Sequence, residues 1–216
     1  MTIPTTPPCS FLALGDSYTI GEGVAPDERW PAQLVRRLRS RGREIDEPAI
    51  VATTGWTTDE LSAAMDATTF APPYALVTLL IGVNNQYRGR GLDNYRVEFE
   101  PLLQRAIALA GGREGAVIVV SIPDWGVTPF ADRQGREQAV VGAEIDAFNE
   151  AAREIAAQHG VAYADVTAES RATGADPTML VADGLHPSAA QYALWADLIL
   201  PMAESSLAEW GHIRAA

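Results

Sequence analysis

The feature that most constrains the fold of this chain is a regular alternation of short β-rich runs with longer amphipathic stretches. This alternation is typical of βαβ units, in which helices cover both faces of a parallel sheet. Two of the β-rich runs, 75–81 and 116–122, are almost entirely apolar, as the central strands of such a sheet should be. We therefore predict an α/β fold, a three-layer α/β/α sandwich with about five parallel strands. The predicted strands span 11–14, 49–53, 75–81, 116–122 and 161–166.

Helical periodicity predicts the elements that connect these strands. The predicted helices span 30–41, 58–67, 94–110 and 144–159, and a last helix runs from 188 towards 209. We expect Pro201 to kink or end that last helix, because proline has no N–H to donate and its ring collides with the preceding turn. The helix at 94–110 shows one apolar stripe at three- and four-residue spacing, formed by Phe99, Leu102, Leu103, Ala106, Ile107 and Ala110.

The length and composition suit one compact domain. A chain of 216 residues with 47% hydrophobic content can bury a sizeable core. We expect a single domain over 1–216, with a disordered leader at 1–8 and a disordered tail at 211–216. The first residues lack the basic and apolar regions of a secretory signal, and no window approaches the ~20 apolar residues of a membrane span. The sequence therefore predicts a cytoplasmic protein without membrane insertion.

The charge balance argues against one class of partner. Sixteen basic and 28 acidic residues give a formal net charge of −12, which repels polyphosphates and anionic surfaces. We therefore expect no nucleic-acid partner and a neutral or small substrate. The sequence does not indicate an oligomeric state.

A candidate nucleophile follows the first predicted strand. The apolar run 11–14 ends in a Gly-Asp-Ser turn that can lift the hydroxyl of Ser17 clear of the sheet edge. If Ser17 also begins a helical turn, the helix N-terminus favours negative charge beside its hydroxyl oxygen. Serine alone is a weak nucleophile, so the chain must also supply a base, a group that orients the base, and donors for the developing oxyanion.

His186 is the candidate base. Of the three histidines, it alone has an acidic residue, Asp183, three positions before it. This spacing lets the carboxylate accept a hydrogen bond from one ring nitrogen while the other nitrogen faces the serine. His159 precedes a glycine and is expected to cap a helix end, and His212 lies in the C-terminal tail.

Four segments together resemble the blocks of the SGNH, or GDSL, hydrolase family, and they occur in the order of that family. The resemblance implies a flavodoxin-like strand order and a serine hydrolase that acts on small-molecule esters. It implies no metal and no cofactor. The four segments are Gly15-Asp16-Ser17-Tyr18, Gly55, Gly82-Val83-Asn84-Asn85 and Asp183-Gly184-Leu185-His186.

The resemblance also implies the role of each site residue. Ser17 would be the nucleophile, His186 the base and Asp183 its orienting acid. The oxyanion hole would consist of the N–H groups of Ser17 and Gly55 and the side-chain amide of Asn84. Because Gly55 and Asn84 follow the second and third predicted strands, they should meet Ser17 at the carboxyl edge of the parallel sheet.

The chain departs from the family pattern at two places. Asn85 stands where the family usually has an aspartate, so that carboxylate is missing. Residues 50–54 replace an Asn-x-Gly segment often seen before the second-block glycine, so the hydrogen-bond support of that loop is in question. Neither departure removes a catalytic atom.

Several side chains close to the predicted catalytic positions are candidates for substrate contact on position alone. The candidates are Trp56, Asn85, Gln86, Tyr87, Arg88 and Trp125. Ordinary packing is the competing interpretation for the aromatic residues, since large aromatic side chains are usually partly or fully buried. Arg88 is more typical of a solvated surface position.

We predict a serine esterase for short-chain acyl esters, because the chain has little spare length for a long acyl tunnel or lid. An acyltransferase or a carbohydrate O-deacetylase would use the same site, and the sequence does not separate them. A non-catalytic phosphate- or nucleotide-binding module is the alternative from a different class. The glycines between 15 and 23 match neither nucleotide-binding pattern, and such a module has no use for Asp183 and His186.

Overall fold

A parallel sheet lies at the centre of the computed structural model, which describes residues 9–215. The strand order β2-β1-β3-β4-β5 is the flavodoxin-like order, with every neighbouring pair parallel. The predicted fold class is therefore confirmed, and each strand overlaps its predicted range. The strands are β1 (Phe11–Gly15), β2 (Ala49–Ala52), β3 (Leu76–Leu80), β4 (Val117–Val120) and β5 (Ala162–Ala164).

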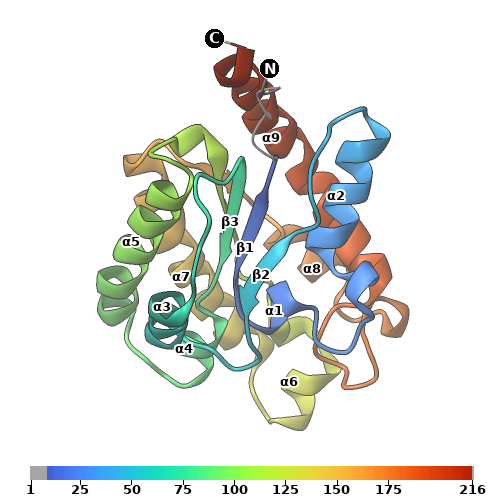
Figure 1. Cartoon of the computed structure of the whole chain (residues 1–216). Helices are drawn as coiled ribbons and strands as arrows, with labels where there is room; N and C mark the ends of the chain where they lie inside the picture. The colour runs from blue at the N-terminus through green and yellow to red at the C-terminus, as the bar shows by residue number, and fades with distance from the viewer. Residues whose placement is uncertain (1–8, 216) are drawn as a thin grey trace.

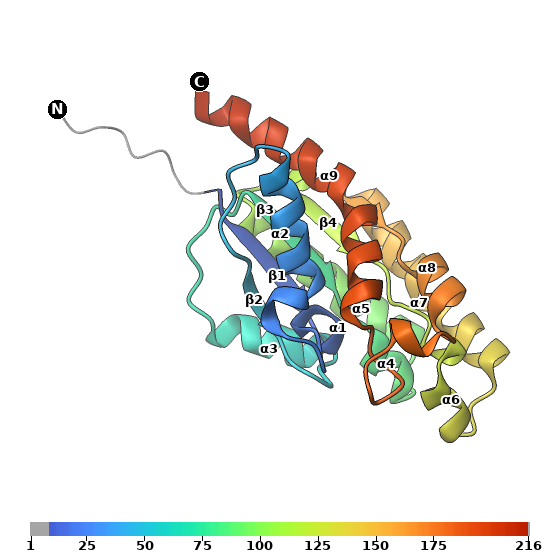
Figure 2. The ribbon, with the colours of Figure 1, turned by 90° about the vertical axis from the view of Figure 1, so that its right-hand side faces the viewer.

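Helices cover both faces of this sheet (Figure 1). On one face, α2 (Trp30–Ser40) packs along α9 (Ala189–Ala215), with α8 (Thr167–Thr173) beside α9. On the other face, α5 (Leu92–Leu109) packs against both α3 (Thr58–Ala67) and α7 (Gln138–Gln158). Figure 2 shows α2 and α9 side by side from the turned view. The three layers bury the sheet completely at its centre.

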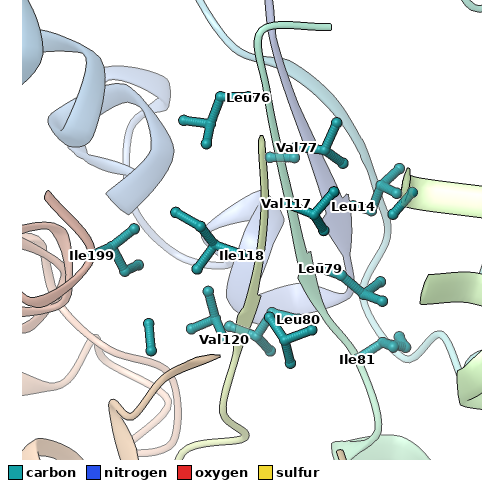
Figure 3. Close-up of a cluster of buried hydrophobic side chains, with 14 of the residues drawn as sticks. Leu14, Leu76, Val77, Leu79, Leu80, Ile81, Val117, Ile118, Val120 and Ile199 are labelled. Carbon is teal, nitrogen blue, oxygen red and sulfur yellow. The ribbon is translucent and has the colours of Figure 1, made fainter. Parts of the chain in front are cut away.

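The core is formed where the central strands meet these helices. Every residue of β1, β3 and β4 is buried, whereas the edge strands β2 and β5 are only partly so. Figure 3 shows apolar side chains of the central strands gathered around the sheet, with Ile199 of α9 among them. The predicted stripe on α5 is largely confirmed, since Ile107 alone among its members is only partly buried.

Short helices lie at the carboxyl edge of the sheet. At that edge lie α1 (Ser17–Ile20), α4 (Val83–Tyr87) and α6 (Pro129–Arg133). Helices of one or two turns are too short to show periodicity, so the sequence pattern missed α4, α6 and α8. Within residues 9–215 there are also four 3₁₀ turns: η1 (Pro26–Glu28), η2 (Glu114–Ala116), η3 (Trp125–Val127) and η4 (Pro177–Met179).

The last helix corrects one of the two alternatives predicted for Pro201, a kink or an end. Pro201 does not end α9, which continues to Ala215 and so includes most of the predicted disordered tail. Leu200 and Ala203, on either side of the proline, are buried, and this packing offsets the hydrogen bond that proline cannot make. The leader at 1–8 lies outside the described residues, and the single-domain organisation stays a prediction. Within residues 9–215, no helix combines the length and apolar composition needed to cross a bilayer.

Candidate active site

Ser17 lies at the carboxyl end of β1, where it is the first residue of α1. The turn is tight: a Cβ on Gly15 would lie 2.4 Å from the Leu80 carbonyl oxygen of β3, so only glycine fits there. The Asp16 carboxylate caps α1 by accepting a hydrogen bond from the Tyr18 N–H at 3.0 Å. The local sequence thus explains both the sharp turn and the position of Ser17 at the sheet edge.

His186 and Asp183 form a directly hydrogen-bonded pair. Nδ1 of His186 lies 2.6 Å from Oδ2 of Asp183. The other carboxylate oxygen accepts the backbone N–H groups of Leu185 and His186, at 2.8 and 3.0 Å. A proton on Nδ1 satisfies the contact with Asp183 and leaves Nε2 as an acceptor. The turn therefore holds the imidazole in the orientation that a general base requires.

Ser17 and His186 line the same pocket, which has a volume of about 160 Å³. The Tyr18 ring packs against the imidazole, with ring centroids 5.5 Å apart and planes at 56°. Among the described residues, no hydrogen bond joins the Ser17 hydroxyl to His186. Catalytic hydrogen bonds often tighten only when substrate is bound, so this geometry is compatible with proton transfer between the two groups.

Three residues that carry potential oxyanion donors line this pocket and come from three different segments of the chain: Ser17, Gly55 and Asn84. Gly55 follows β2 with φ of +89°, a conformation that favours glycine. Neither the Ser17 nor the Gly55 N–H has an acceptor among the described residues. Asn84, in α4, donates one amide hydrogen to the Trp56 carbonyl at 2.8 Å, and an amide nitrogen carries a second. The pocket thus offers donors beside a serine hydroxyl.

The far wall of the pocket is apolar and aromatic. The Tyr87 ring lies edge-on to Trp125, with centroids 5.4 Å apart, and Trp125 lies edge-on to Phe130 at 6.0 Å. The indole N–H of Trp125 donates to the Gln86 side chain at 2.8 Å, which fixes the plane of the ring. The apolar wall is lined by Val83, Tyr87, Trp125, Phe130 and Leu185.

Sequence reasoning identified part of this wall. Tyr87 is a candidate because it closely follows the predicted oxyanion residue Asn84, and Trp125 because it follows the fourth predicted strand. Phe130 was missed, since it lies in the short helix α6, far along the chain from Ser17, and no local pattern marks it. Leu185 was visible in the segment that contains His186, but nothing in that segment indicates which way its side chain points.

The sequence profile of the GDSL-like Lipase/Acylhydrolase family matches residues 13–194, a range that contains all of the positions described above. The chain belongs to this family. The predicted resemblance is therefore confirmed at the level of the family. No curated protein sequence matches the chain.

Solved structures show the same GDSL-like fold. TesA is 24% identical with a TM-score of 0.71, and the match covers 92% of this chain and 99% of TesA. The lipase/acylhydrolase from Enterococcus faecalis is 23% identical with a TM-score of 0.69, over 89% of this chain and 93% of that protein. Axe2, an acetylxylan esterase from Geobacillus stearothermophilus, is 21% identical with a TM-score of 0.69, over 90% and 93% of the two chains. At these identities the likeness establishes the fold.

Two of the expected substrate contacts lie away from the pocket of this GDSL-like hydrolase. Asn85 is fully buried, and its side chain accepts the Thr58 N–H at 3.1 Å and donates to the Thr58 hydroxyl at 2.6 Å. Trp56 contributes its carbonyl to Asn84, and its side chain packs on the core. Because α4 turns by about 100° per residue, Asn84 faces the pocket and Asn85 faces α3. The structure therefore gives Trp56 and Asn85 supporting positions.

Two more residues near the predicted catalytic positions, Gln86 and Arg88, do not line the pocket but bind groups that do. Gln86 is buried, and while its side-chain oxygen accepts from Trp125, its amide donates to Glu144 at 2.5 Å. Arg88 is exposed, as expected for a surface residue, and its guanidinium also donates to the Gly55 carbonyl at 2.6 Å. The segment after β3 therefore holds both the aromatic wall and the Gly55 loop of the GDSL-like fold.

The carboxylates near Ser17 have different electrostatic environments. Partial burial disfavours the charged form of Asp183, but hydrogen bonds from the His186 ring and from two backbone N–H groups outweigh it and lower its pKa. Complete burial raises the pKa of Asp16 to about 7, against the hydrogen bond from the Tyr18 N–H. Asp183 is therefore the carboxylate suited to pair with an imidazolium. In the described part of this GDSL-like chain, no three His, Cys, Asp or Glu side chains are grouped as metal ligands.

Proposed function

We propose that this protein is a serine esterase that hydrolyses short-chain, acetyl-type carboxylic esters through an acyl-serine intermediate. The observation that carries the proposal is the composition of one small pocket. Its lining combines a serine hydroxyl, an acid-oriented imidazole and three potential oxyanion donors with an apolar wall. Each of these groups has a defined role in acyl transfer.

In the acylation step, Oγ of Ser17 attacks the ester carbonyl carbon while its proton passes to Nε2 of His186. Asp183 accepts from Nδ1–H and stabilises the imidazolium that forms. The carbonyl oxygen becomes an oxyanion, which the three pocket donors stabilise. The imidazolium then protonates the alkoxy oxygen, the C–O bond breaks and the alcohol leaves.

In the deacylation step, water attacks the carbonyl carbon of the acyl-serine. His186 removes a proton from that water and the same three donors stabilise the second oxyanion. When the tetrahedral intermediate collapses, the proton returns from His186 to Oγ of Ser17 and the carboxylic acid is released. No metal and no cofactor is needed for either step.

The size of the pocket supports a short acyl group. A cavity near 150 Å³ lined by apolar side chains accommodates a molecule of about the size of benzene, and this pocket has about 160 Å³. Tyr87, Trp125 and Phe130 form an aromatic cluster in its lining. An acetyl to butyryl chain fits this space, whereas a fatty acyl chain has to extend beyond it.

The proposal is tested with p-nitrophenyl esters from acetyl to palmitoyl, assayed with wild type, Ser17→Ala and His186→Ala. The expected result is activity that is highest for the shortest chains and that falls by at least about 10³-fold in both variants. His159→Ala is the matched control, because His159 lies at the end of α7 and pairs with Glu100. If folded wild type hydrolysed none of these esters, the general esterase proposal would be wrong.

An acetylated carbohydrate is the second substrate class to test, because an acetyl group fits the pocket and Axe2, which shares the fold, is an acetylxylan esterase. The same acyl-serine can also pass its acyl group to an alcohol instead of water. Adding an alcohol acceptor to the assay and measuring the new ester against free acid separates a transferase from a hydrolase. The cytoplasmic location expected from the sequence stays a prediction.

A further inference from the structure

The loop between β2 and α3 carries Gly55 but lacks the Asn-x-Gly segment that often precedes this glycine in the family. The structure shows that α4 supplies part of the support of this loop, while the Thr54 hydroxyl donates to the Glu22 carboxylate at the start of the loop. Asn84 donates to the Trp56 carbonyl at 2.8 Å, and Asn85 accepts the Thr58 N–H at 3.1 Å. These contacts hold the second half of the loop.

Arg88 holds Gly55 itself. It is the C-cap residue of α4, and its Nη2 donates to the Gly55 carbonyl oxygen at 2.6 Å. Its Nη1 lies 3.3 Å from Oε2 of Glu60. The same carboxylate oxygen accepts the Thr57 N–H at 2.9 Å and so caps α3. One planar guanidinium therefore connects Gly55 with the capped start of α3, and its fork geometry suits two acceptors at once.

Gly55 needs such an anchor because of its conformation. With φ of +89° and no side chain, its backbone has more conformational freedom than any other residue type would have. Its N–H and its carbonyl group belong to successive peptide planes, so fixing the carbonyl restricts ψ and limits how far the N–H can move. A Cβ at Gly55 would lie 3.5 Å from Nη2 of Arg88, which shows how closely the guanidinium approaches.

We propose that Arg88 is a positioning residue for the oxyanion hole, which it serves by anchoring the carbonyl of Gly55. The proposal rests on the proposed esterase function, because it assigns the Gly55 N–H to the oxyanion. Arg88 is not among the residues that line the pocket, so it acts through Gly55 and not on the substrate. Its loss should therefore affect the transition state more than substrate binding.

The first test compares Arg88→Ala with Arg90→Ala. Arg90 is a matched control, because it binds the side chain of Asp59 in α3 at 2.6 Å and makes no contact with the Gly55 carbonyl. Arg88→Ala should lower kcat for p-nitrophenyl acetate by about 10–100-fold with KM changed by less than about twofold. Arg90→Ala should leave both constants within about twofold, and Arg88→Lys should lie between Arg88→Ala and wild type because lysine has no fork.

The second test measures the loop directly by hydrogen exchange of peptides that span 53–57. Exchange should become at least about tenfold faster in Arg88→Ala and remain unchanged in Arg90→Ala. Unchanged exchange in Arg88→Ala, or equal losses of kcat in both variants, would overturn the proposal. If wild type proved inactive on every ester, the esterase proposal would fail, and the exchange result alone would still decide whether Arg88 positions Gly55.

Discussion

Oδ2 of Asp183 lies 2.6 Å from Nδ1 of His186, while Oδ1 of the same carboxylate accepts two backbone N–H groups of the turn that carries the histidine. One carboxylate thus folds the turn and orients the ring. Both interactions use the ionised form of Asp183, and together they lower its pKa despite partial burial. The ring orientation is therefore built into the local backbone.

Replacing Asp183 with asparagine should lower kcat by about 10²–10⁴-fold, because an amide N–H facing Nδ1 favours the tautomer with its proton on Nε2. Steady-state kinetics on p-nitrophenyl acetate measures the effect. Asp176→Asn is the matched control, since Asp176 also caps a turn, by accepting the Thr178 N–H at 2.8 Å, but lies next to no histidine. A loss of less than about tenfold in Asp183→Asn would mean that the carboxylate does not orient the base.

Replacing Asn84 should lower activity, whereas replacing Asn85 should lower stability. Asn84→Ala removes a pocket donor and should lower kcat by about 10²–10³-fold, with KM little changed. Asn85→Ala removes two buried hydrogen bonds to Thr58 and should lower the free energy of unfolding by about 1–3 kcal/mol. Urea denaturation and kinetics on both variants separate the two effects. Equal kinetic losses at matched stability would contradict the assignment of Asn84 as the oxyanion donor.

Tyr87→Ala should shift the preferred acyl chain towards greater length. The Tyr87 side chain lines the pocket and packs edge-on to Trp125, yet the residue is 43% exposed, so its removal opens the wall without opening the core. The ratio of kcat/KM for octanoyl to acetyl esters should rise by at least about tenfold. Val97→Ala, at an exposed position on α5, is the control. An unchanged ratio would show that Tyr87 does not limit the acyl chain.

Stability should depend on the protonation of Asp16, whose pKa burial raises to about 7. At pH values between 3.8, the pKa of an unperturbed aspartate, and about 7, Asp16 is protonated in the native state and ionised in the unfolded state. The free energy of unfolding therefore falls as pH rises over this range, and the stabilisation by the bound proton is lost once pH passes about 7. Relative to Asp16→Asn, the free energy of unfolding of wild type should fall by roughly 2–3 kcal/mol from pH 5 to pH 8. Urea denaturation at both pH values measures this, and a constant difference would contradict it.

The different environments of two adjacent residues, Asn84 and Asn85, could not be predicted from the sequence. Asn84 and Asn85 are the same residue type at consecutive positions, and the family pattern assigned the oxyanion role to the first. The pattern did not predict that the second would bind the backbone of Thr58, because that contact depends on how α4 packs against α3. Likewise, local geometry allowed the helix to end at Pro201, whereas burial of the surrounding residues stabilises a helix that continues beyond this proline.

The sequence by itself determined the α/β class, the strand-to-helix turn at Ser17 and the Asp183–His186 spacing. These depend on short-range periodicity, on glycine where the backbone is crowded and on hydrogen bonds within a few residues. Only the tertiary structure decided which side chains face the pocket, the aromatic wall with Phe130 and the anchoring of Gly55 by Arg88. Those contacts join segments far apart in the chain, and their geometry depends on how the layers pack, which local pattern does not encode.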